Sequence, residues 1–131
     1  MIIAEELRRP RPALRFDGPE HVLDVNAALL ALRAEPHPGA RGHRQITILH
    51  HGPVRLVLVA FEAGGRMPAH QAPGWVTIHV LRGSLHVHTA GAQHVLGAGQ
   101  ILALAPGVPH DVDAISEADM LLGVYPGAPT R

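Results

Sequence analysis

The segment that decides the fold is Gly64-Gly-Arg-Met-Pro-Ala-His70-Gln-Ala72-Pro-Gly-Trp75-Val76-Thr-Ile-His-Val-Leu-Arg-Gly83. Glycine and proline cluster at its start, in its middle and at its end, while apolar residues alternate through its second half. Such clusters mark turns, and such alternation is typical of a strand with one buried face. A second segment of the same kind is Gly99-Gln-Ile-Leu-Ala-Leu-Ala105-Pro-Gly107-Val-Pro-His110. Both segments therefore predict strands that are joined by tight turns.

Similar short runs fill the chain from residue 44 onward and predict seven or eight strands in one domain. Their even spacing favours an all-β sandwich or barrel. The run 54–61 is apolar on both faces, so we expect the core to cover one side and a helix or a partner subunit to cover the other. The predicted strands are residues 44–50, 54–61, 75–81, 84–89, 93–96, 100–104, 110–115 and 119–125.

A single helix is predicted over residues 19–34, on the N-terminal side of the strands. Apolar residues recur there at spacings of three and four, which gives one apolar stripe. Asp17 and Glu20 have the spacing of a capping box, and Pro36 ends the helix. The stripe consists of Val22, Val25, Leu29 and Leu32.

Composition narrows the function classes. The chain has 131 residues, 11 basic and 11 acidic, so its formal net charge is zero and we expect neither nucleic acid nor a membrane surface as partner. There is no cysteine and no apolar run of the ~20 residues that span a bilayer, which is compatible with a cytoplasmic protein. The 11 histidines are the unusual feature, because histidine is the commonest metal ligand.

The two segments resemble the paired motifs of the cupin family of small β-barrels. Gly64, His70 and Gly83 match the first motif, and Gly99, Gly107 and His110 match the second. The resemblance implies an antiparallel barrel (a double-stranded β-helix or jelly roll) with one N-terminal helix. We expect an N-terminal extension over residues 1–42, the barrel over 43–126 and a C-terminal tail over 127–131.

The resemblance also implies a metal site of three His and one Glu, which this chain carries only in part. His70 and His110 stand at two of the ligand positions, whereas Ala72 and Val76 stand at the other two. A divalent site usually has at least three protein ligands. We therefore expect either no cofactor or a weakly bound divalent metal at His70 and His110.

Alternation along the predicted strands defines a pocket that is small, mostly apolar and equipped with two imidazoles. His110 and Val112 share one face, and Val76 and Ile78 face them from another strand. Such a cavity suits a small ligand. The predicted pocket residues are His70, Trp75 at the mouth, Val76, Ile78, His110 and Val112.

The same alternation places His79, His86 and His88 outside. The turn at Arg82-Gly83 is expected to place their two strands side by side, so we expect these three histidines to share one outer face. They are interpreted there as solvated or interface residues, with a surface metal site as the alternative.

Three functions remain open, and no catalytic residue is assigned. The first is a non-enzymatic cupin that binds a small molecule in the pocket. The alternative is a metal-dependent enzyme of the dioxygenase or isomerase type that uses His70 and His110. The third is a structural subunit that oligomerises through its outer His face and the strand at 54–61. Because cupins commonly pair through their sheets, we expect a homodimer.

Overall fold

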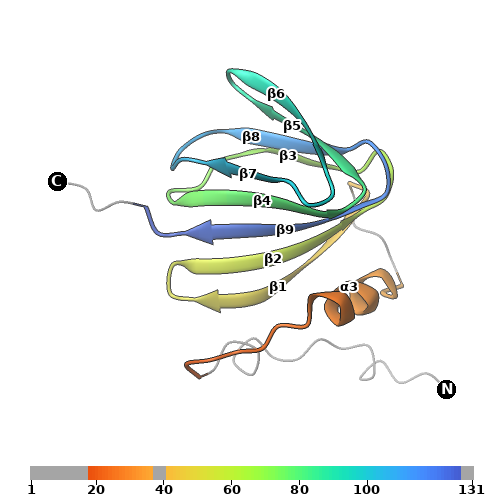
Figure 1. Ribbon diagram of the computed structural model, residues 1–131, viewed down its shortest axis with the longest axis vertical. Helices are drawn as coiled ribbons and strands as arrows, with labels where there is room; N and C mark the ends of the chain where they lie inside the picture. The colour runs from red at the N-terminus through yellow and green to blue at the C-terminus, as the bar shows by residue number, and fades with distance from the viewer. Residues whose placement is uncertain (1–17, 37–40, 128–131) are drawn as a thin grey trace.

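A computed structural model describes residues 18–36 and 41–127, which form two antiparallel β-sheets and one helix (Figure 1). The five-stranded sheet has the order β1 (His43–His51), β2 (Val54–Phe61), β9 (Ala118–Tyr125), β4 (Trp75–Arg82) and β7 (Ile101–Leu104). The four-stranded sheet has the order β3 (Arg66–His70), β8 (His110–Ala114), β5 (Ser84–Thr89) and β6 (Ala92–Gly97).

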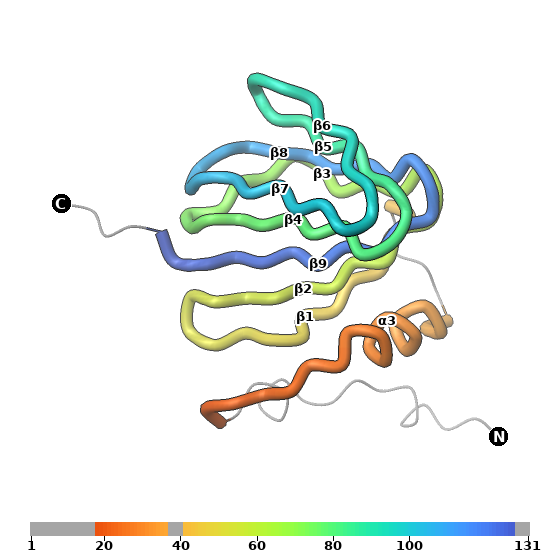
Figure 2. Tube along the Cα trace, in the orientation of Figure 1, coloured from red at the N-terminus to blue at the C-terminus, as the bar shows by residue number. Residues whose placement is uncertain are grey.

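The strand order confirms the all-β prediction and refines it. β9, near the end of the described chain, lies between β2 and β4, as the tube in Figure 2 shows. The described strands form two separate sheets rather than one closed ladder, so the architecture is a two-sheet sandwich. β3 was not predicted, because it is short, contains Pro68 and is largely exposed.

Alternation decides which side chains form the core. In β4 every second residue is buried, and Val76, Ile78 and Val80 are at most 3% exposed. β5 contributes Leu85 and Val87 from the opposite sheet in the same way. The core therefore lies between the two sheets and consists almost entirely of aliphatic side chains.

The helix, α3 (Val25–Arg33), is shorter than predicted. Its N-cap is Asp24, whose side chain accepts a hydrogen bond of 2.9 Å from the backbone N–H of Ala27. The predicted start at residue 19 was therefore wrong, because the stripe begins before the backbone turns helical; Asp17 lies outside the described residues.

The helix covers the outer face of β2. Leu29 and Leu32 pack against Leu58 and Ala60, which are at most 1% exposed. The sequence predicted that either a helix or a partner subunit covers the outer face of this strand, and the helix is the one observed. The strand supplies no argument for a partner subunit, and the homodimer stays a prediction.

Asp119 links the helix to the five-stranded sheet. Its carboxylate is 6% exposed and accepts hydrogen bonds from Arg33 Nε at 3.1 Å and from Arg82 Nε at 3.0 Å. Arg82 also donates to Glu117, a bond that raises the pKa of Arg82 and lowers that of Glu117.

No helix in the described part of the chain is long and apolar enough to cross a membrane.

Gly83 carries the chain from one sheet to the other. Its φ is +79°, and a Cβ at this position would lie 2.8 Å from the Cα of Ala118, so glycine is needed there for both reasons. β4 and β5, on either side of this turn, lie in different sheets. The prediction that these strands lie side by side was therefore wrong.

Candidate functional site

One end of the sandwich contains an open cavity of about 790 Å³. The β1–β2 turn, the loop between β3 and β4 and the end of β9 surround it. Its apolar side chains are those of Pro53, Val57, Met67, Ala72, Pro73, Val76, Leu122, Val124 and Pro126. Its polar side chains include those of Gln45, His50, Arg55, His70 and Gln71.

His70 and His110 face each other across the pairing of β3 with β8. Their ring centroids are 4.2 Å apart in an edge-to-face arrangement. Each Nδ1 lies 3.0 Å from a backbone carbonyl two residues earlier, at Pro68 for His70 and at Val108 for His110. Because a carbonyl only accepts, Nδ1 is the donor in both rings, and in the neutral form each Nε2 keeps a lone pair.

His110 is the unusual member of this pair, because it is only 2% exposed. Its Nε2 is buried and has no hydrogen-bond partner among the described residues. Burial is the main effect and lowers the pKa of His110; the hydrogen bond to the Val108 carbonyl raises it by less, and the neighbouring His70 lowers it by less still. The lowered pKa favours the neutral form of His110 at pH 7.

The predicted pocket residues separate into two groups. His70 and Val76 line the cavity. Ile78 and Val112 are at most 1% exposed, deep in the core between the sheets, and His110 lies behind His70. Trp75 is 45% exposed and is not among the lining residues.

Sequence reasoning missed Arg55 and His50 at the cavity. The two residues are cross-strand partners on β2 and β1, and Arg55 also pairs with Val124 of β9. Strand alternation could have identified Arg55, because it lies two residues before Val57 and four before Val59, whose side chains face the core. The cavity therefore offers a guanidinium group as well as imidazoles.

The interior residues do not fit the metal centre of three His and one Glu. His70 and His110 supply two nitrogen donors, and no carboxylate lines the cavity within residues 18–36 and 41–127. Glu62, the acidic residue closest in sequence to His70, is instead paired with Arg44 at 3.3 Å. Two donors without a negative ligand are suited to weak binding of a divalent ion at most.

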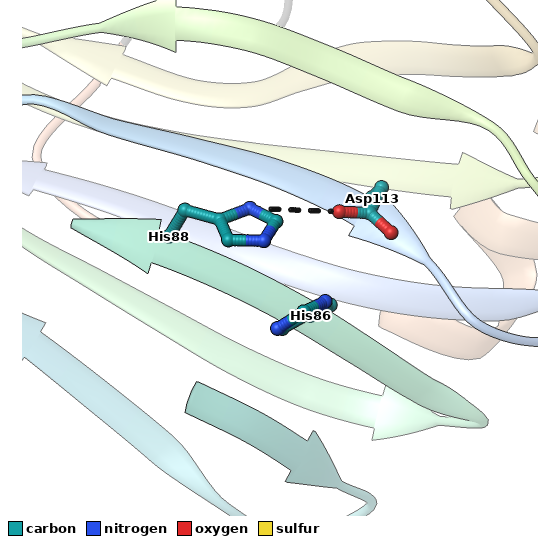
Figure 3. A group of neighbouring side chains, drawn as sticks. All are labelled: His86, His88 and Asp113. Carbon is teal, nitrogen blue, oxygen red and sulfur yellow. Dashed lines mark ion pairs between the residues drawn. The ribbon is translucent and has the colours of Figure 1, made fainter. Parts of the chain in front are cut away.

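A second histidine cluster lies on the outer face of the four-stranded sheet. His86 and His88 project from β5, and Asp113 faces them from the adjacent strand β8 (Figure 3). One possible ligand atom from each of these three residues lies within 4.8 Å of the other two. Such a His/His/Asp group could hold a metal ion.

His79 does not belong to that cluster. Alternation placed it correctly opposite the core-facing residues of β4, but β4 is in the five-stranded sheet. The predicted common outer face of His79, His86 and His88 was therefore wrong for His79 and right for the other two. Asp113 was missed as their neighbour, because its position depends on the pairing of β5 with β8.

The comparison with protein families identifies the class. The sequence profile of the cupin domain matches residues 57–124, more than half of the chain. The chain belongs to the cupin family, as its two motifs implied. None of the curated proteins is a match.

Solved structures show the same fold. A conserved protein of unknown function from Streptococcus pyogenes is 19% identical, with a TM-score of 0.67, 87% of this chain and 96% of that chain covered. A cupin superfamily protein from Desulfitobacterium hafniense is 15% identical, with a TM-score of 0.67 and coverages of 82% and 94%. KdgF from Halomonas sp. is 20% identical, with a TM-score of 0.58 and coverages of 73% and 85%. At these identities the likeness concerns the fold alone.

Proposed function

We propose that this cupin binds a small organic molecule in the cavity at the end of the sandwich. The ligand has an apolar body and one acidic group. The apolar body matches the aliphatic lining of the cavity, the acidic group is held by Arg55, and the ring of His70 contacts the ligand from the cavity wall.

The observation that carries this proposal is the combination of a cavity of about 790 Å³ with a fixed imidazole in its wall. The Pro68 carbonyl holds the ring of His70, and the ring of His110 packs against it. Polar groups that are held in place before binding lose little conformational freedom when a ligand arrives. This favours binding of a specific molecule over a passive role.

The charge of the cavity supports an acidic ligand. Arg55 contributes a permanent positive charge, and the described lining has no carboxylate to neutralise it. An anion in the cavity would be attracted by this guanidinium and would accept hydrogen bonds from it.

A thermal-shift screen tests the proposal with matched probes. We would compare aliphatic monocarboxylates with alcohols of the same carbon skeleton on tag-free protein. Carboxylates should raise the melting temperature and alcohols should not. Arg55→Gln should abolish the shift, and His70→Ala should reduce it because the ligand loses a contact with the cavity wall. His79→Ala is the control, because His79 lies on β4 and is not among the lining residues. Equal shifts by both probe series, or unchanged shifts in Arg55→Gln, would contradict the proposal.

A metal-dependent enzyme of the dioxygenase or isomerase type is the second candidate. One observation favours it: the Nε2 atoms of His70 and His110 are both left with lone pairs by the hydrogen bonds of their Nδ1 atoms. Elemental analysis of tag-free protein tests it. Near-stoichiometric metal that is lost in both His70→Ala and His110→Ala would favour the enzyme, and retention of metal in both variants would exclude this pair as its ligands.

A further inference from the structure

We propose that the outer face of the four-stranded sheet binds a divalent transition-metal ion through His86, His88 and Asp113. This site is separate from the cavity, because the four-stranded sheet lies between them. It does not depend on the proposed function of the cavity.

Strand geometry brings the three side chains together. His86 and His88 are two residues apart on β5, so they project from the same face, opposite the buried Leu85 and Val87. Their ring centroids are 4.1 Å apart. Asp113 is the direct cross-strand partner of His86 on β8, so its carboxylate lies on that same face (Figure 3).

The donor set indicates the class of metal. Two imidazole nitrogens and one carboxylate oxygen suit zinc and its first-row neighbours better than calcium or magnesium, which prefer all-oxygen sites. The candidate ligand atoms already lie within 4.8 Å of one another. Bonds of roughly 2.0 Å to a tetrahedral ion require a spacing somewhat below this value, which side-chain rotation on a partly exposed strand can supply.

Asp111 fixes one of the ligands. It is the cross-strand partner of His88, and its Oδ1 lies 2.6 Å from Nδ1 of His88. A carboxylate that accepts a hydrogen bond from Nδ1 orients the ring and leaves the lone pair on Nε2 for a metal. We therefore assign Asp111 as a positioning residue.

An ordinary ion pair does not account for the whole cluster. Pairing of His88 with Asp111 leaves His86 packed against His88, and it leaves the second carboxylate, Asp113, 3.7 Å from the same Nδ1. Two carboxylates on one face repel each other. A bound divalent cation would compensate both charges and would use both imidazoles.

The site has room for further ligands. Beside the cluster lies a hollow of about 890 Å³, which His88, Asp111 and Asp113 line together with Arg41 and Arg66. Three protein ligands leave at least one coordination position for water. The ion would therefore be accessible from solvent.

Calorimetric titration of tag-free, chelator-stripped, full-length protein with Zn²⁺ tests the proposal. Wild type should bind about one ion at this site, and His86→Ala and Asp113→Asn should each weaken it at least about tenfold. Asp113→Asn is nearly isosteric and guards against a change in fold, which circular dichroism checks for every variant. Asp111→Asn should weaken binding by a smaller factor, since it removes only the negative charge of the group that orients His88.

Two control variants separate this site from other histidines. His79→Ala removes a partly buried imidazole from the other sheet, and His70→Ala removes the cavity imidazole. Both should leave the outer-face affinity unchanged. The proposal is overturned if His86→Ala and Asp113→Asn bind Zn²⁺ as wild type does, or if His79→Ala weakens binding equally, which would indicate adventitious binding by surface histidines.

Discussion

Two histidine pairs lie on opposite faces of the same four-stranded sheet, and they differ in almost every other respect. The inner pair, His70 with His110, has its Nδ1 atoms held by backbone carbonyls, and one ring is almost fully buried. The outer pair, His86 with His88, is partly exposed and is accompanied by two carboxylates. The same type of side chain therefore contributes to a cavity on one face and is a candidate metal ligand on the other. The difference arises from the residues that the period-two alternation places beside each pair.

The largest expected effect is on stability, and it comes from placing a carboxylate on the buried face of β8 and an apolar side chain on its outer face. Val112→Asp buries a carboxylate at a position that is 1% exposed, and we expect it to cost about 4 kcal/mol or more of unfolding free energy. Asp113→Val changes a partly exposed position and should alter stability by roughly 0.5 kcal/mol. Urea denaturation of both variants measures the difference. Similar destabilisation by the two changes would contradict the assignment of the faces.

Adding a donor to the inner pair should make it resemble the outer one. Ala72 lines the cavity in the same loop region as His70, and it stands at a ligand position of the family motif. We expect Ala72→His to strengthen Zn²⁺ binding at least about tenfold, or ~1.4 kcal/mol. The titration uses a His86→Ala background, which removes the outer site. Ala98→His, in an exposed turn, is the control, and an equal gain in that variant would contradict the prediction.

A smaller effect should appear in the pH dependence of stability. Burial holds the pKa of His110 below its ordinary value of 6.5, so between those two pKa values the unfolded chain binds more protons than the folded one. Stability due to His110 is complete above pH 6.5 and falls as the pH drops toward the folded pKa, by at most ~1.4 kcal/mol per pH unit.

Urea denaturation of wild type and His110→Gln between pH 5 and 8 measures this slope. The variant should lose part of the decline, while the other histidines contribute equally to both proteins. Parallel profiles would show that His110 is not held neutral by the fold.

The fold was predictable from sequence because its signals are local. The turn glycines and the alternation in residues 75–81 and 100–104 follow from backbone conformation and from burial on one side of each strand. β3 escaped prediction because Pro68 interrupts a short, exposed run, so neither propensity nor alternation marks it. The helix start was misplaced because the apolar stripe continues before the cap at Asp24.

The sites were only partly predictable, because they depend on pairing between distant strands. The motifs identified His70 and His110, and parity correctly placed His86 and His88 outside. Asp113 joins the outer pair only through the register of β5 with β8, which no local pattern encodes. Alternation along its strand could have placed Arg55 on the inner face, but the strand is apolar on both faces and the alternation was therefore not used.

Anomalous diffraction at the zinc edge, from crystals of the full-length protein grown with Zn²⁺, tests the contrast between the two faces most directly. We expect an anomalous peak on the outer face, bonded to His86, His88 and Asp113. A peak bonded to His70 and His110 with none on the outer face would contradict it, and so would zinc that is found only at contacts between molecules in the crystal.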